Sequence, residues 1–110
     1  MEIKKICGQK AGAIKITAED NDVVAGRAFL YILYNELHAE PFGFLEDVFV
    51  DEPYRSKGVG AQLVQAAIGE AREQGCHKLI CTSRYGRDGL HKWYAGFGFK
   101  EHGTEFRMDF

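Results

Sequence analysis

A change in the period of the apolar residues near the middle of the chain constrains the fold more than any other feature. Residues 42–50 are rich in Phe and Val and predict a strand, whereas apolar residues between positions 58 and 74 recur at helical spacing. Gly75 is typical of a residue that ends a helix, and residues 79–82 predict a short buried strand. Such a strand–helix–strand unit places its two strands parallel in one sheet, joined by a right-handed crossover.

The segment that precedes this unit predicts an antiparallel hairpin. Residues 13–17 alternate apolar and polar side chains, which is typical of a half-buried strand. Residues 19–22 read Glu-Asp-Asn-Asp and predict a turn, and residues 23–34 are rich in Val, Phe, Leu, Tyr and Ile. Two strands joined by so short a turn pair antiparallel.

The segment that follows the unit predicts a second helix over residues 89–97 and a final strand over residues 104–110, where Phe106, Met108 and Phe110 alternate with polar residues. The predicted order is therefore β-β-β-α-β-α-β. This is an α/β fold (α+β, mixed sheet), mostly antiparallel with one parallel strand pair. With 110 residues, we expect a single domain over residues 1–110.

Composition excludes several functional classes. The chain is 45% hydrophobic and carries a formal net charge of -2, so it has neither the composition of a disordered chain nor the charge of a nucleic-acid-binding protein. No apolar run reaches the roughly 20 residues of a membrane span, and the N-terminus lacks a signal peptide's apolar stretch. The three cysteines show no zinc spacing, so we expect reduced thiols, no metal site and a cytoplasmic protein.

The turn into the long helix reads Tyr-Arg-Ser-Lys-Gly-Val-Gly-Ala over residues 54–61. Gly58 and Gly60 let the backbone come close to a ligand, and they stand where a helix begins. The unpaired N–H groups and the positive dipole end of a helix N-terminus favour an anion, and Arg55 and Lys57 add charge beside it. The turn therefore suits a phosphate or pyrophosphate.

Three phosphate-binding motifs compete for this turn. A P-loop needs a lysine after its last glycine, and a dinucleotide fingerprint needs a third glycine where Leu63 stands, so neither fits. Arg55 to Ala61 does fit Arg/Gln-x-x-Gly-x-Gly/Ala. With residues 45–55 before it and Trp93-Tyr94-Ala95-Gly96-Phe97-Gly98-Phe99 after it, the chain resembles the GNAT acetyltransferase superfamily in about two-thirds of its length.

The resemblance implies an enzyme that transfers an acetyl group from acetyl-coenzyme A, as co-substrate, directly to an amine. It also implies a GNAT-like acyl-CoA N-acyltransferase fold, in which the parallel strand pair splays to admit the pantetheine arm. The main chain of one strand would pair with that arm, and the glycine loop would take the pyrophosphate. The coenzyme-binding residues implied are Val48, Phe49, Val50, Arg55, Ser56, Lys57, Gly58, Val59, Gly60 and Ala61.

Two side chains are the candidates for catalysis. Glu46 interrupts an apolar strand, on the same face as Phe44, Val48 and Val50 by period-two counting, and its place matches the general base that similar enzymes use through a water. Asp47 faces the other way unless a bulge reverses the count, so it stays in reserve. Tyr94 matches the tyrosine that protonates the leaving thiolate, since a phenol stays protonated at neutral pH.

The chain departs from the family pattern in two places. Arg87 stands where many members have an asparagine that contacts the coenzyme, and residues 85–91 could form a mobile loop from which Arg84, Arg87 or His91 contacts a substrate. The front of the chain shows no counterpart of the usual N-terminal helices, which help to form the acceptor site. We therefore expect a short member whose acceptor pocket is open or completed by a second subunit, as in a homodimer.

The acceptor stays open at this stage. Residues 45–47 resemble the polyamine acetyltransferases, and residues 46–48 with 75–80 resemble the glucosamine-6-phosphate acetyltransferases, but both matches are short. We expect a small-molecule or peptide amine as the partner, with no nucleic acid and no membrane. The alternative is a non-catalytic module that binds or senses acyl-coenzyme A, and a weaker one is an interaction subunit that binds no ligand.

Overall fold

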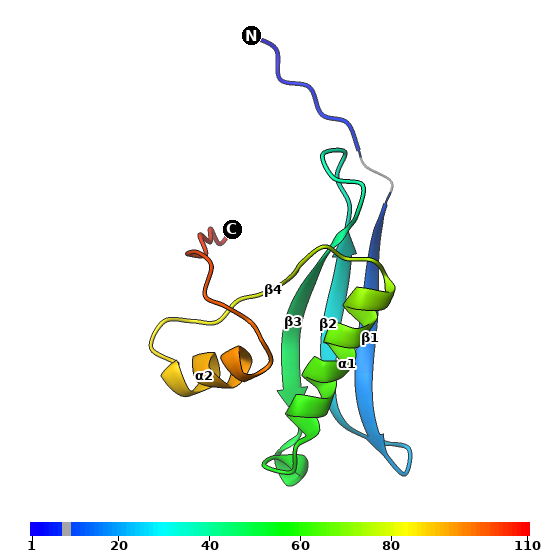
Figure 1. Ribbon diagram of the computed structural model, residues 1–110, viewed down its shortest axis with the longest axis vertical. Coiled ribbons are helices and arrows are strands. Elements are labelled where there is room, and N and C mark those ends of the chain that lie inside the picture. The colour runs from blue at the N-terminus through cyan, green and yellow to red at the C-terminus, as the bar shows by residue number, and fades with distance from the viewer. Residues whose placement is uncertain (8–9) are drawn as a thin grey trace.

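The computed structural model describes residues 1–7 and 10–110 and contains a four-stranded mixed sheet with two α-helices (Figure 1). The elements in chain order are β1 (Ala11–Asp20), β2 (Val23–Leu33), β3 (Phe42–Val50), a 3-10 helix η1 (Glu52–Tyr54), α1 (Val59–Glu73), β4 (Leu79–Cys81) and α2 (Asp88–Gly96). This agrees with the predicted order as far as α2. In the part of the chain described, neither helix is long and apolar enough to cross a bilayer.

The strands lie in the order β1-β2-β3-β4. The pairs β1–β2 and β2–β3 are antiparallel, and β3 pairs with β4 in parallel. Because α1 connects the two parallel strands, the predicted strand–helix–strand unit is confirmed. The fold class is confirmed with it.

The hydrophobic core lies between α1 and one face of the sheet, where Figure 1 shows α1 crossing the strands. Side chains on one side of α1 pack against alternate residues of β2 and β3, because these two periods present apolar positions to one another. The buried core residues are Ala25, Ala28, Leu30, Ile32, Leu45, Leu63, Val64, Ala67 and Ala71.

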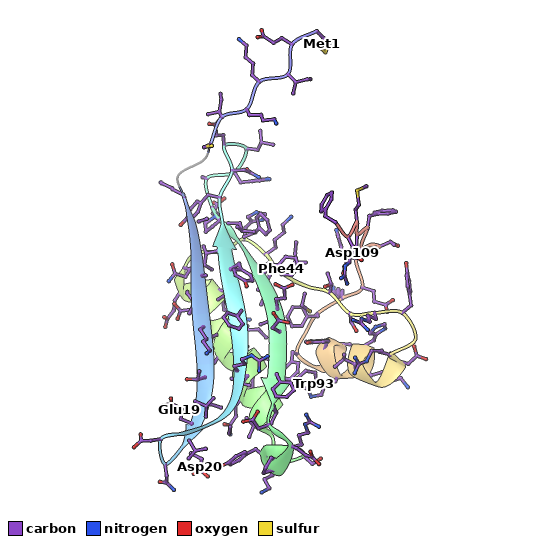
Figure 2. The ribbon with its side chains drawn as sticks, turned by 180° about the vertical axis from the view of Figure 1, so that it is seen from behind. Met1, Glu19, Asp20, Phe44, Trp93 and Asp109 are labelled. Carbon is purple, nitrogen blue, oxygen red and sulfur yellow. The ribbon has the colours of Figure 1, made fainter. Side chains whose placement is uncertain are left out.

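The opposite face of the sheet has no helix over it in the described part of the chain (Figure 2). We call it the open face and define it by three cross-strand pairs that lie in successive rows on β2 and β3. These pairs are Tyr31 with Phe44, Phe29 with Glu46, and Arg27 with Phe49.

A β-bulge in β3 corrects one sequence expectation. The β2–β3 register shifts between Arg27 and Phe29, and Asp47 adopts a left-handed backbone with φ 53°. The extra residue turns every later side chain to the opposite face. Glu46 therefore shares a face with Phe44 as predicted, but Val48 and Val50 point to the α1 side, where they pack against the core.

The final strand predicted over residues 104–110 is wrong. No residue from Lys100 to Phe110 is in a strand, and Phe106, Met108 and Phe110 are almost fully exposed. Figures 1 and 2 show this segment beside α2 and away from β1–β3. An alternating pattern becomes a strand only when a neighbouring strand supplies hydrogen-bond partners, and none does so here.

Candidate functional site

The parallel strand pair is short, and this opens one edge of β3. The pairs Gly43–Leu79, Phe44–Ile80 and Leu45–Cys81 are the whole of the β3–β4 ladder. β3 then continues for five residues to Val50, and the bulge at Asp47 lies where the two strands part. The main chain of β3 beyond Leu45 thus has no strand partner on the β4 side. The sequence had implied such a splay only through the family resemblance.

The glycine turn at the N-terminus of α1 has the conformation that an anion site needs. Gly58 is the N-cap at φ 83°, a left-handed conformation that strongly favours glycine, and no side chain caps the helix. The first turn is closed by the main-chain N–H of Gln62, which donates to the carbonyl oxygen of Gly58 at 3.1 Å. The N–H groups of Val59, Gly60 and Ala61 precede this bond and carry the positive end of the helix dipole.

Ser56 also adopts a left-handed backbone, with φ 62°. A side chain in this conformation strains the backbone by about 1 kcal/mol, and the loop is formed despite this strain.

The two basic side chains of the turn contact different partners, Arg55 the end of β3 and Lys57 a residue of the turn itself. Arg55 donates from Nε to the carbonyl oxygen of Val50 at 2.9 Å, and its guanidinium lies 5.5 Å from the ring centre of Phe49. Lys57 Nζ lies 6.0 Å from the ring centre of Tyr54. The Arg55 side chain thus lies against the end of β3.

Gly60 serves packing as well as access. A Cβ atom at Gly60 would lie 3.4 Å from Cζ2 of Trp93 and 3.7 Å from Cγ2 of Val50. The Trp93 ring therefore joins α2 to the start of α1 and the end of β3. Sequence reasoning had assigned Gly60 to the ligand alone. Trp93 had been named only as part of the segment that resembles the family, and the tight Gly60–Trp93 approach depends on tertiary packing.

Tyr94 is half-buried beside the point where β3 and β4 part. Its ring meets those of Trp93 and Phe99 edge-on, at 5.1 and 5.7 Å between centres. Burial raises the pKa of the Tyr94 phenol, Cys81 raises it further, and the charge of Arg87 opposes this shift. The phenol is therefore protonated at neutral pH and can donate its proton.

Cys81 is a neighbour of Tyr94 that sequence reasoning did not place in the site. Burial raises the pKa of its thiol to about 11, so the sulfur is a neutral thiol at neutral pH. The residue pairs with Leu45, which directly precedes Glu46. The fold thus brings Tyr94 to the same end of the β3–β4 ladder as Glu46.

Glu46 and Asp47 are both exposed. Glu46 lies on the open face opposite Phe29, and Asp47 forms the bulge at the mouth of the splay. The sequence expectation of a carboxylate in an otherwise apolar face is met only in part, because Phe44 and Phe29 are its neighbours while Val48 and Val50 lie behind the sheet.

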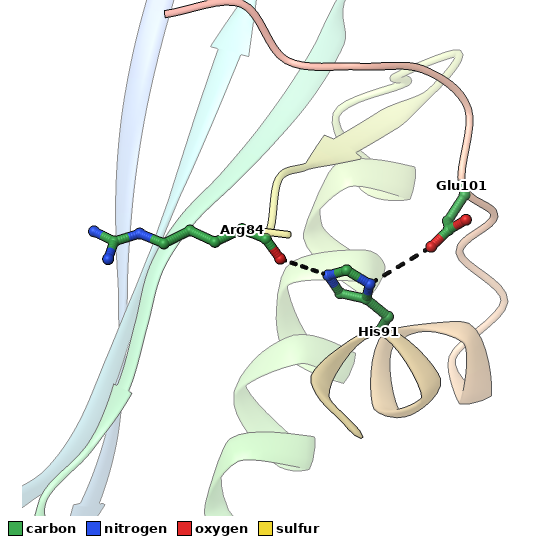
Figure 3. A network of polar contacts seen from close by, with 3 residues as sticks. All are labelled: Arg84, His91 and Glu101. Carbon is green, nitrogen blue, oxygen red and sulfur yellow. Dashed lines mark hydrogen bonds and ion pairs between the residues drawn. The ribbon is translucent and has the colours of Figure 1, made fainter. Parts of the chain in front are cut away.

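The segment predicted as a loop over residues 85–91 is held at both ends. Its last residues belong to α2, and His91 Nε2 lies 3.0 Å from the carbonyl oxygen of Arg84 (Figure 3). Because a carbonyl only accepts, Nε2 carries a proton. His91 Nδ1 lies 3.5 Å from Oε1 of Glu101, a contact that is an ion pair when the ring is protonated at Nδ1 as well.

A groove of about 260 Å³ is lined by the C-terminal half of α1, by residues 76–79 and by residues 97–99. It borders the site, because the Phe99 ring contacts that of Tyr94. Among residues 1–7 and 10–110, no group of three or more His, Cys, Asp or Glu side chains could hold a metal ion.

Comparison with known proteins finds acetyltransferases among the relatives of this chain. A family model described as "Acetyltransferase (GNAT) family" matches residues 2–99. The chain is 37% identical over 70 residues to the probable glucosamine 6-phosphate N-acetyltransferase 2 of Oryza sativa subsp. japonica, covering 62% of this chain and 39% of that protein. It is 33% identical over 67 residues to the aminoglycoside N(6')-acetyltransferase type 1 of Stenotrophomonas maltophilia, covering 61% and 44%.

Among solved structures, an acetyltransferase of Trypanosoma brucei superposes with a TM-score of 0.80 at 28% identity, covering 90% of this chain and 70% of that one. The chain spans less than half the length of the two curated relatives above.

Proposed function

Because the chain belongs to the acetyltransferase (GNAT) family, we propose that it transfers the acetyl group of acetyl-coenzyme A to a small primary amine. One observation carries the proposal: the β3–β4 ladder ends after three residue pairs and leaves an open strand edge that leads to the N-terminus of α1. An extended arm that ends in a pyrophosphate needs both parts of this arrangement.

The coenzyme would be held mainly by the backbone. The pantetheine amides would pair with main-chain groups of β3 at Val48, Phe49 and Val50, as an added strand does at a sheet edge. The pyrophosphate would accept hydrogen bonds from the N–H groups of the turn between Arg55 and Ala61, where the helix dipole stabilises negative charge.

The acetyl transfer needs one base and one acid. An alkylamine has a pKa of about 10.4, so Glu46 would take its extra proton through a water before the nitrogen attacks the thioester carbonyl carbon. The new C–N bond forms first and gives a tetrahedral intermediate, whose oxyanion a β3 N–H would stabilise; the C–S bond then breaks. Tyr94 would give its phenolic proton to the leaving thiolate, and the second proton of the nitrogen would pass through water to restore the phenol.

The acceptor would be a small molecule, because the relatives described above are named for amino sugars: glucosamine 6-phosphate for one and aminoglycosides for the other. We also propose that the chain forms a homodimer, which would cover Phe106, Met108 and Phe110 at the exposed C-terminal end. A monomer by light scattering at micromolar concentration would contradict the dimer.

The coenzyme site is tested by calorimetry with acetyl-coenzyme A on two glycine variants. Gly58→Ala places a side chain at φ 83° in the proposed pyrophosphate turn, and Gly75→Ala places one at φ 76° at the other end of α1. The backbone strain is similar in the two variants, about 1–2 kcal/mol. We expect about tenfold weaker binding for Gly58→Ala and unchanged affinity for Gly75→Ala.

Thiol release from acetyl-coenzyme A, measured over a panel of primary amines, tests the reaction itself. Binding of the coenzyme without turnover of any amine would leave the alternative, a non-catalytic acyl-coenzyme A module. No binding heat and no thermal shift with acetyl-coenzyme A would reject both functions.

A further inference from the structure

Two guanidinium groups face one aromatic ring at the end of the open face. The Cζ atom of Arg27 lies 4.8 Å from the ring centre of Phe49, and that of Arg55 lies 5.5 Å from the same centre. The hydrogen bond from Arg55 Nε to Val50 holds one of the two groups in place. The two positive charges are therefore within about 10 Å of each other.

Among residues 1–7 and 10–110, no carboxylate forms a salt bridge with either arginine; the pairs are Lys4 with Glu2, Arg107 with Asp109 and, when the imidazole is protonated, His91 with Glu101. Contact with a ring stabilises an exposed cation by only about 0.5–1 kcal/mol and leaves its N–H donors free. Free guanidinium donors match a phosphoryl or phosphonyl group, whose oxygens accept paired hydrogen bonds, and a second positive charge nearby favours the same anion.

This arginine pair lies one row from the proposed base. On β2, Arg27 pairs with Phe49, and Phe29, two residues further, pairs with Glu46. Two residues of a strand span about 7 Å. A molecule on the open face could thus place an amine near Glu46 while an anionic group a few bonds away meets Arg27.

We infer that the acceptor is an amine bearing a phosphoryl or phosphonyl group, which Arg27 binds on the open face beside the Phe49 ring, with the positive charge of Arg55 on the same ring. The inference rests on the proposed acetyltransferase function and narrows its substrate class. A polycationic acceptor such as an aminoglycoside is disfavoured, because its extra ammonium groups would meet the two guanidiniums. The pyrophosphate of the coenzyme has its own site in the backbone turn at the start of α1.

Matched pairs of amines test the inference through kcat/KM. The pairs are glucosamine 6-phosphate with glucosamine, and 2-aminoethyl phosphate with ethanolamine. We expect the phosphorylated member to be preferred at least tenfold. Arg27→Gln should remove most of this preference by raising KM about tenfold for the phosphorylated amine alone, with the unphosphorylated amine and acetyl-coenzyme A unaffected.

Lys78→Gln is the matched control. It also removes a cation from an aromatic ring of β3, since Lys78 Nζ lies 5.2 Å from the ring centre of Phe42, but at the far end of the strand. The preference should stay within twofold of the unmodified protein. An equal loss in both variants would mean that overall charge is responsible, and would overturn the inference.

The 3'-phosphate on the coenzyme ribose is the other phosphoryl group that the two arginines would recognise. If Arg27→Gln raises KM for acetyl-coenzyme A, and 3'-dephospho-acetyl-coenzyme A abolishes that change, the arginines bind the coenzyme and the acceptor assignment is wrong. Turnover with no preference for phosphorylated amines also overturns the inference but keeps the proposed function.

A binding measurement tests the anion site independently of the proposed acetyltransferase function. The side-chain N–H resonance of Arg27 should shift when 2-aminoethyl phosphate is added, and Arg27→Gln should abolish saturable binding. If that holds while no amine is acetylated, the anion site stands and the catalytic proposal falls. If the phosphorylated amine causes no shift at millimolar concentration, the anion site is rejected.

Discussion

Gly26→Ala tests whether the end of β3 is held where the proposed coenzyme site needs it. Gly26 lies on β2 opposite Val50 and faces α1. An added Cβ would lie 2.8 Å from the main-chain oxygen of Phe49 and 3.1 Å from Cδ1 of Leu63. The leucine can rotate away, but the carbonyl oxygen belongs to the strand backbone, so β3 itself has to move.

The magnitude follows from these contacts. Forcing an extra carbon into a packed site destabilises a protein by about 1–3 kcal/mol. Replacing glycine recovers about 0.5–1 kcal/mol by restricting the unfolded chain. We expect a net loss of about 1–2 kcal/mol, which lowers Tm by roughly 5–15 °C in a domain of this size. Acetyl-coenzyme A should also bind more weakly, since Phe49 and Val50 shift.

Thermal and urea denaturation measure the loss, and Gly12→Ala on β1 is the control. A Cβ at Gly12 meets no atom within 4 Å, so this variant should be as stable as the parent or slightly more stable. Equal stabilities of the Gly26 and Gly12 variants would refute the close approach of β2 and β3 at this row. A large loss in both would refute the packing explanation for Gly26.

Three further predictions concern the chemistry of the site. Tyr94→Phe should lower kcat about 100-fold with little change in KM for acetyl-coenzyme A. Because burial raises the pKa of Tyr94, the unmodified enzyme should keep its activity up to about pH 10. A fall in activity near neutral pH that Tyr94→Phe removes would contradict the role of this phenol. Glu46→Gln should lower kcat/KM about 100-fold at pH 7 and less at pH 10, where a much larger share of the amine is neutral without a base. Asp47→Asn should change kcat/KM less than threefold, and the reverse result would move the base to Asp47. Burial raises the pKa of Cys81 from 9.0 to about 11, so the folded protein favours the protonated thiol over the thiolate. The contribution of Cys81 to the free energy of unfolding is therefore complete below pH 9 and is lost as pH rises through 11. Urea denaturation from pH 7 to 11 should show that fall, and Cys81→Ala should reduce it.

Most of the secondary structure and the glycine turn could be predicted from the sequence, because both depend on interactions between residues near in the chain. The helical spacing of apolar residues gave α1 to within a residue at each end, and the glycine at position 58 stands where the backbone is left-handed. The order strand–helix–strand then required a parallel pair, since a crossover of that length allows no other arrangement.

The sequence could not decide which face each catalytic candidate occupies. Counting by two placed Glu46 with Val48 and Val50, and the bulge at Asp47 separates them. A bulge forms when the hydrogen bonds and packing of both strands favour one extra residue, and a single strand's pattern does not contain that information.

Contacts between segments that are distant in the chain determined the remaining differences between the sequence prediction and the structure. Residues 104–110 alternate like a strand but meet no neighbouring strand, whereas Arg27, Phe49 and Arg55 come from separate segments and meet only after β2 and β3 have paired. Local pattern thus determined the helices and strands as far as α2 and the place of the glycine turn at a helix start. Tertiary structure alone decided the faces, the splay of β3 from β4 and the arginine pair, because each depends on contacts between residues distant in the chain.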